Sequence, residues 1–119
     1  MKGTLFVLGA AALLIGVAFA QSNASGNAEN GKRLFLRDGC WECHGYAGQG
    51  GTAGARIGAT SLSMQGFMRY VRQPAATMPA FTEKVVNDSD LTDIYAYLKS
   101  LPPVKPAKDI PLLNQMKNQ

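Results

Sequence analysis

The chain begins with a continuous apolar block and continues with shorter segments in which apolar residues recur at helical spacing. Residues Leu5 to Ala20 carry no charged side chain, follow Lys2 and end in an A-x-A pattern. This arrangement is typical of a secretory signal peptide, and the block is shorter than the roughly 20 apolar residues that a transmembrane helix needs. We therefore predict a signal peptide at 1–20 and a domain in a bacterial periplasm, with an uncleaved membrane anchor as the alternative.

Three amphipathic segments after this block are predicted to be helices. Each begins at a residue suited to capping a helix N-terminus, and proline stops the second and the third. Apolar residues recur three or four positions apart, so one face of each helix is expected to be buried. Behind a disordered polar leader at 21–26, the helices are expected at Ala28–Arg37 after Asn27, from Ser61 or Ser63 to Gln73, and from Asp88 to Lys99.

The spacing also predicts which residues form the core. The expected core residues are Leu34 and Phe35 in the first helix, Met64, Phe67, Met68 and Val71 in the second, and Leu91, Ile94, Tyr95 and Leu98 in the third. Gly31 shares the face of Leu34, although a glycine inside a helix costs about 1 kcal/mol relative to alanine. Another helix is therefore expected to pass close to Gly31. Residues 102–119 carry prolines and lysines and are predicted to be an extended tail.

Composition excludes several function classes. The chain has two cysteines and one histidine, which excludes a Cys2His2 zinc finger, a His-Glu-x-x-His protease and a scaffold of several disulfides. The formal net charge of +4 comes without a stripe of basic residues interleaved with aromatics, so nucleic-acid binding is not predicted. The glycine-rich stretch 45–60 lacks a phosphate-loop signature. A weak positive charge is compatible with docking on acidic partner proteins.

The cysteines and the histidine lie together in Cys40-Trp41-Glu42-Cys43-His44. This is the C-x-x-C-H pattern of c-type haem attachment, in which two thiols add to the two vinyl groups of one porphyrin and the histidine supplies an axial nitrogen. A thioredoxin-like site would need a βαβ context, a lone disulfide would leave His44 unexplained, and a zinc site would lack a fourth ligand. We therefore predict one covalently bound haem c.

The second axial ligand of the iron is predicted by elimination. No second histidine exists, Met64 and Met68 belong to the predicted core, and Met116 lies in the tail. Met78 stands in a loop between two helices, where a following proline stiffens the chain. The predicted metal ligands are His44 and Met78. Together they would leave the iron without an open position, which suits electron transfer rather than substrate activation.

These motifs, in this order, resemble class I c-type cytochromes, which are small, mostly helical electron carriers with one haem. The matching elements, within a domain at 27–101, are Gly31-x-x-Leu34-Phe35, Cys40 to His44, Tyr70 to Pro74, Met78 to Phe81 and Asp93 to Leu98. The resemblance implies an all-α cytochrome c fold, with three to four helices wrapped around the haem and thioether bonds at Cys40 and Cys43. It also implies that the first and last helices cross, so that Gly31 and Phe35 meet Ile94 and Tyr97.

The chain departs from this family after the haem motif. The family commonly has a proline there whose carbonyl accepts the ring N–H of the axial histidine, and no proline occurs between His44 and Gln73. The carbonyl of a residue such as Ala55 is expected to take this role. Arg56 is the candidate partner of a haem propionate, because guanidinium suits carboxylate, with a plain surface arginine as the alternative. The aromatic candidates for the haem pocket are Trp41, Phe67, Tyr70 and Phe81.

The leading functional prediction is a periplasmic electron carrier, not an enzyme, that shuttles single electrons between a dehydrogenase or respiratory complex and a terminal acceptor. Its docking face for redox partner proteins is expected near Lys32, Arg33, Arg69, Arg72 and Lys84. One alternative is a tightly bound cytochrome subunit of a periplasmic dehydrogenase. The others are a gas-binding or peroxidatic haem protein with an open sixth position, and a haem-free structural protein.

Overall fold

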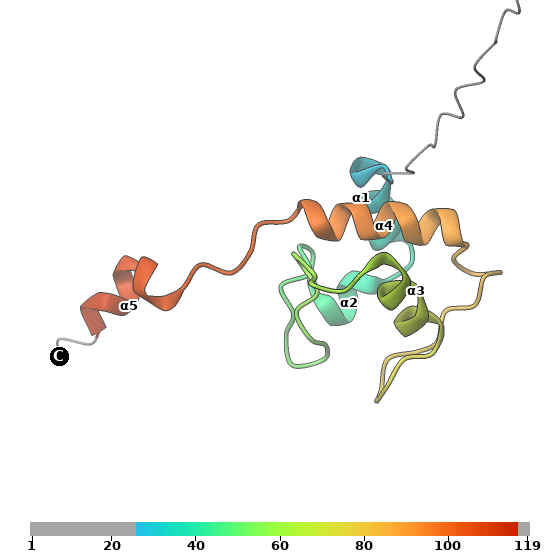
Figure 1. Ribbon diagram of the computed structural model, residues 1–119. Helices are drawn as coiled ribbons and strands as arrows, with labels where there is room; N and C mark the ends of the chain where they lie inside the picture. The colour runs from blue at the N-terminus through green and yellow to red at the C-terminus, as the bar shows by residue number, and fades with distance from the viewer. Residues whose placement is uncertain (1–25, 117–119) are drawn as a thin grey trace, which may run out of the picture.

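The computed structural model describes residues 26–116, so the predicted signal peptide and residues 21–25 of the leader lie outside the described part. The elements in order are α1 (Ala28–Arg37), α2 (Cys40–His44), α3 (Met64–Arg72), α4 (Asp88–Ser100), the 3-10 helix η1 (Ala107–Asp109) and α5 (Pro111–Met116) (Figure 1). No strand occurs within residues 26–116. The predicted all-α fold class is confirmed.

The three longest helices begin at side chains that satisfy their first free backbone groups. Asn27, Ser63 and Asn87 are the caps, and their side chains accept hydrogen bonds from the backbone N–H groups of Asn30 (3.0 Å), Gly66 (3.1 Å) and Asp90 (2.9 Å). Such caps stabilise a helix by about 1 kcal/mol each. Of the two serines considered for α3, Ser63 is therefore the cap.

Helices α1 and α4 cross in close contact at Gly31 (Figure 1). A Cβ atom on Gly31 would lie 2.9 Å from the backbone nitrogen of Ile94 and closer still to the carbonyl of Asp93. One turn further along α1, the ring of Phe35 packs against the ring of Tyr97, with the ring centroids 5.5 Å apart. The close approach predicted for Gly31, and the contacts expected across it, are confirmed.

The core lies between these helices and α3. Its buried apolar residues are Leu34, Phe35, Phe67, Val71, Val86, Leu91, Ile94, Tyr97 and Leu98. Tyr95 is only partly buried and packs against the edge of the core, and its hydroxyl donates to the carbonyl of Leu62, just before α3 (2.8 Å). Met68 packs against the core in the same way, whereas the prediction is wrong for Met64, the first residue of α3, which stays outside the core.

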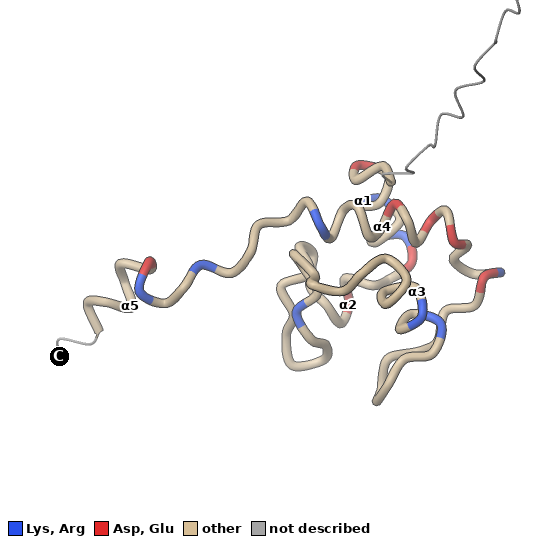
Figure 2. The backbone as a smooth tube through the Cα atoms, viewed as in Figure 1, with Lys and Arg blue, Asp and Glu red and all other residues tan. Residues whose placement is uncertain are grey.

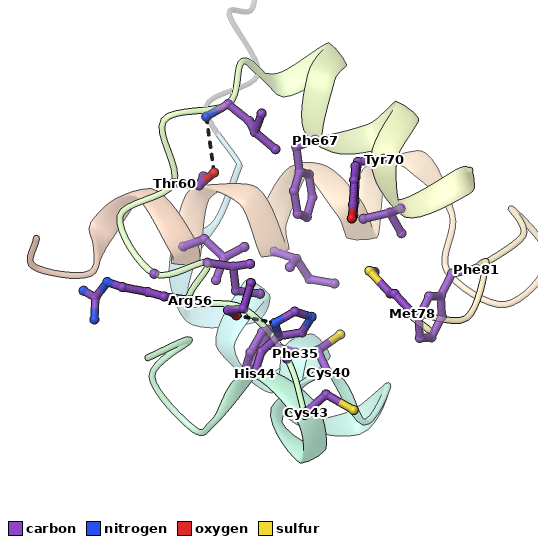
Figure 3. Close-up of a pocket in the computed structure, with 18 of the residues that line it drawn as sticks. Phe35, Cys40, Cys43, His44, Arg56, Thr60, Phe67, Tyr70, Met78 and Phe81 are labelled. Atoms are coloured by element: carbon purple, nitrogen blue, oxygen red, sulfur yellow. Dashed lines mark hydrogen bonds between the residues drawn. The ribbon is translucent and has the colours of Figure 1, made fainter. Parts of the chain in front are cut away.

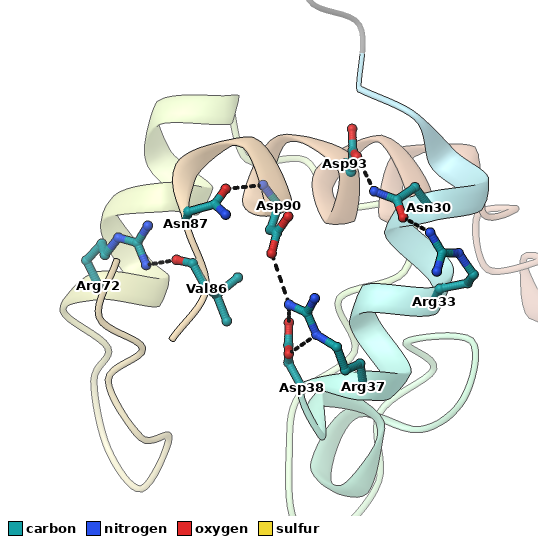
Figure 4. A network of polar contacts seen from close by, with 9 residues as sticks. All are labelled: Asn30, Arg33, Arg37, Asp38, Arg72, Val86, Asn87, Asp90 and Asp93. Carbon is teal, nitrogen blue, oxygen red and sulfur yellow. Dashed lines mark hydrogen bonds and ion pairs between the residues drawn. The ribbon is translucent and has the colours of Figure 1, made fainter. Parts of the chain in front are cut away.

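Polar contacts fasten both ends of α1 to α4 (Figure 4). At the start of α1, the carboxylate of Asp93 accepts from the backbone N–H of Asn27 (2.7 Å) and from the side-chain amide of Asn30 (2.6 Å). At its end, Arg37 pairs with Asp38 (2.7 Å) and with Asp90 of α4 (3.0 Å). These contacts set the register of the two helices and hence the wall that α4 presents to the interior.

The segment after α4 leaves the helical domain (Figure 1). The prediction of a wholly extended tail is wrong for residues 107–116, which form η1 and α5. Proline favours such a turn because it lacks an N–H that would be unpaired at a helix start, and Pro111 is the first residue of α5. Among residues 26–116, no helix has the length and apolar character needed to cross a membrane.

Candidate haem site

An apolar cavity of about 740 Å³ opens between α2, α3, α4 and the loop that carries Met78 (Figure 3). Core side chains form much of its wall, namely Phe35, Phe67, Val71, Leu91, Ile94 and Leu98. Protein interiors hold few voids larger than a water molecule, and ligand sites measure about 300–1,000 Å³. The cavity therefore has the size and lining of a site for one large apolar group.

The single-turn helix α2 brings both cysteines to this cavity (Figure 3). Cys40 and Cys43 are free thiols rather than a disulfide. Burial raises the pKa of the Cys40 thiol to about 11, whereas cysteines that exchange disulfides have a lowered pKa. Within residues 26–116, no group of three His, Cys, Asp or Glu side chains could hold a metal ion. The described residues therefore support neither the redox alternative nor the zinc alternative for this motif.

His44 is held by the loop that follows α2. Its Nδ1 lies 2.6 Å from the carbonyl oxygen of Ala55, which confirms the bond expected in place of a proline carbonyl. Because a carbonyl only accepts, Nδ1 carries the proton and donates it in this bond. With Nδ1 engaged in this bond, Nε2 is the nitrogen available to a metal, and the bond strengthens it as a ligand.

The loop reaches His44 because glycine lets it pass close to α2. A Cβ atom on Gly54 would lie 2.8 Å from the carbonyl oxygen of Cys43. The backbone N–H of Gly50 donates to the carbonyl of His44 (2.8 Å), and the N–H of Ile57 donates to the carbonyl of Gly48 (2.8 Å). The glycine-rich stretch is therefore a folded support for the histidine, and Gly54 is the position where a side chain would push it away.

Met78 enters the cavity from a different wall than His44 (Figure 3). Its side chain is partly buried and packs against the core. The loop that carries it ends at Phe81, whose backbone N–H donates to the carbonyl of Val71 at the end of α3 (3.1 Å). The structure thus brings one imidazole and one thioether to the same apolar cavity.

The other predicted pocket residues behave differently from one another. Phe67, Tyr70 and Phe81 line the cavity, whereas Trp41 does not and stacks on Tyr46, with ring centroids 4.5 Å apart. Arg56 contributes to the lining, but its guanidinium donates to the carbonyl of Pro102 (3.0 Å) and points away from the cavity in Figure 3. Five helix residues expected only as core also line the cavity, namely Phe35, Val71, Leu91, Ile94 and Leu98. An apolar stripe alone gives no signal for that second role.

None of the five basic residues expected at a docking face lines the cavity. Arg33 bonds to the side chain of Asn30 on α1, and Arg72 is turned inward by three hydrogen bonds. The loops 51–55 and 75–80, parts of which line the cavity, contain no charged residue (Figure 2). Charge in a sequence does not reveal which way a side chain turns, so this surface was not predictable from the pattern.

The comparison with known families shows to which kind of domain this cavity belongs. The family model described as cytochrome C oxidase, cbb3-type, subunit III, matches residues 26–98, which is more than half of the chain. The chain belongs to this family of class I c-type cytochrome domains. No curated protein and no solved structure matches it. A c-type cytochrome domain transfers electrons through a covalently bound haem c, works with redox protein partners, and usually lies outside the cytoplasm.

The residues of this cytochrome domain fit such a haem. A covalent c-type attachment needs two thiols side by side and an adjacent imidazole, and α2 supplies Cys40, Cys43 and His44 to one wall of an apolar cavity. The cavity has the volume of a ligand site rather than of a packing defect. Both thiols are free, and the imidazole already has its Nδ1 proton engaged by Ala55.

Proposed function

We propose that this chain is a periplasmic electron carrier in which Cys40 and Cys43 form the thioether bonds and His44 and Met78 are the axial ligands of the haem iron. The observation that carries the proposal is the pairing of a histidine fixed through Nδ1 with a methionine that enters the same cavity from another wall. Neither ligand belongs to a segment that must refold to reach the cavity.

The bound haem would supply a one-electron Fe(III)/Fe(II) couple. Thioether ligation favours the ferrous state and raises the reduction potential. The Ala55 carbonyl keeps the proton of His44 on Nδ1 and fixes the ring plane. The apolar walls exclude water, and α2 with its loop is fixed before any electron arrives. The guanidinium of Arg56 spends one donor on the carbonyl of Pro102, and its remaining N–H groups could serve a haem propionate if the side chain turned toward the rim of the cavity.

A second candidate is a bound cytochrome subunit of a larger redox enzyme, such as a periplasmic dehydrogenase. The tail favours it, because its apolar side chains Leu112 and Met116 are 66% and 58% exposed. Exposed apolar residues in series are typical of segments that bind a partner. The two candidates share the same haem site and differ in how long the partner stays. Size-exclusion chromatography of protein from its native source separates them: a monomer supports the carrier and a stable larger complex supports the subunit.

Optical spectra of the exported, matured protein test the ligand set. The oxidised wild type is expected to show a sulfur-to-ferric-iron charge-transfer band, and the reduced form is expected to bind carbon monoxide poorly. Met78→Ala should lose the band and bind carbon monoxide readily, whereas Met116→Ala, which removes an exposed tail methionine, should change neither. A wild type that binds carbon monoxide readily would instead support the gas-binding or peroxidatic alternative, and a colourless protein would support the haem-free one.

A further inference from the structure

We infer that Arg72 is the positioning residue of the Met78 loop, because its guanidinium holds the backbone of Phe81 and so keeps the Met78 sulfur at the iron. The inference rests on the proposed function, since it takes Met78 as the ligand. Arg72 does not line the cavity, and its effect on the ligand passes through the loop.

The contacts of Arg72 are directed inward. It is the last residue of α3, and its side chain is 22% exposed. One terminal nitrogen donates to the carbonyls of Phe81 (2.8 Å) and Val86 (2.7 Å), and the other donates to the carboxylate of Asp88 (2.6 Å). Figure 4 shows the guanidinium reaching across to Val86. One side chain thus joins the end of α3 to both ends of the segment between the Met78 loop and α4.

Phe81 is the anchor that matters for Met78. Its N–H donates to the carbonyl of Val71 (3.1 Å) and its carbonyl accepts from Arg72, so both polar groups of its backbone are held by the end of α3. Residues 74–80 make no backbone hydrogen bond to another part of the described chain. Phe81, three residues after Met78, is therefore the nearest point at which this side of the loop is fixed.

Arginine is suited to this role in a way that other residues are not. A guanidinium offers five N–H donors in a rigid plane, so one group can serve two carbonyls and a carboxylate at once. The carbonyls of Phe81 and Val86 face part-buried surroundings, where an unpaired acceptor is costly. The Asp88 side chain is 63% exposed, and exposed ion pairs contribute little. The two carbonyl bonds are therefore the contacts that hold the loop.

Imidazole binding to the ferric protein tests the inference, because imidazole must displace Met78 and so reports how easily the loop opens. Arg72→Gln should bind imidazole at least about tenfold more tightly than the wild type. The variant loses hydrogen bonds that hold the loop closed, and each hydrogen bond to a charged group changes an equilibrium constant by about tenfold or more. Arg72→Lys, which keeps the charge and fewer donors, should fall between Gln and wild type. Arg69→Gln, the same change at an exposed position of α3, and Asp88→Asn should stay within about twofold of wild type.

A second readout does not involve the iron. Hydrogen exchange at the Phe81 amide should be faster in Arg72→Gln, with the amides of α1 and α4 unchanged. A merely structural role would lower the unfolding midpoint without changing imidazole affinity or Phe81 exchange, and that result would overturn the inference. If Arg72→Gln does not fold, Arg72→Lys serves as the test, and an imidazole affinity equal to that of the wild type would overturn the inference. Failure of the proposed function looks different: the wild type itself would then lack the sulfur-to-iron band.

Discussion

Replacing Gly31 with alanine tests the crossing of α1 and α4 on which the cavity depends. The added methyl group would overlap the Asp93 carbonyl and lie 2.9 Å from the nitrogen of Ile94. These are backbone atoms of a helix, so they cannot move aside as a flexible side chain would. The two helices must separate or slide, and Phe35 and Ile94, which form part of the cavity wall, move with them.

The expected loss follows from two opposing effects. Overpacking typically costs about 1–3 kcal/mol, and the overlap with backbone places this site at the upper end. Alanine recovers about 1 kcal/mol of helix propensity relative to glycine. The net loss is therefore about 2 kcal/mol, which lowers the melting temperature of a domain of this size by about 10 °C.

Thermal and urea unfolding of the haem-bound protein measure this loss, with Gly66→Ala as the matched control. Gly66 lies in α3, where a Cβ atom would meet only the Ser63 hydroxyl at 3.2 Å and Leu62 side-chain atoms at 4.0 Å. Gly66→Ala should therefore cost much less than Gly31→Ala, because a single side-chain hydroxyl must shift by a few tenths of an ångström rather than a helix backbone. If Gly31→Ala is as stable as Gly66→Ala, the close crossing of α1 and α4 is wrong.

Three further predictions concern stability. Burial raises the pKa of Tyr97 above its ordinary value of 10.0, so the folded state holds the phenol proton more strongly than the unfolded state does. The contribution of Tyr97 to stability is therefore full below pH 10 and falls as the pH rises past 10. Unfolding midpoints measured across this pH range should fall less in Tyr97→Phe than in the wild type. Asn87→Ala removes the cap of α4, whose oxygen accepts from the Asp90 N–H (2.9 Å), and should cost about 1 kcal/mol in urea unfolding, whereas Asn87→Ser should retain most of it. Deleting residues 106–119 should leave the melting temperature unchanged, because α5 packs on η1 and not on α1 to α4; a fall of several degrees would show that the tail supports the domain.

Local signals made much of this molecule predictable. Caps and apolar spacing depend on neighbouring residues, so the helices at 28–37 and 64–72 lie within the predicted ranges. Gly31 was informative because a glycine in a helix is unfavourable unless something passes close to it. The Ala55 carbonyl was predictable because the ring N–H of an axial histidine needs an acceptor and no proline follows the haem motif to supply it.

Features set by contacts between distant segments were not predictable. The side of α4 that meets α1 decides that Tyr97 rather than Tyr95 is buried, and one helical stripe cannot distinguish them. The backbone is left-handed at Ala59 (φ 56°) and Ala76 (φ 58°), a conformation that glycine usually adopts, so no residue type marked these turns. The side chain of Arg72 turns inward because it binds the carbonyls of Phe81 and Val86, and the sequence alone does not predict where those carbonyls lie.

Iron-edge X-ray absorption on the matured protein, in the oxidised and in the reduced state, tests the central claim most directly. The account predicts a six-coordinate iron with one sulfur neighbour in both states, and loss of that sulfur in Met78→Ala. An iron without a bound sulfur in the wild type, or a five-coordinate iron after reduction, would contradict ligation by His44 and Met78 and the electron-carrier function proposed on it.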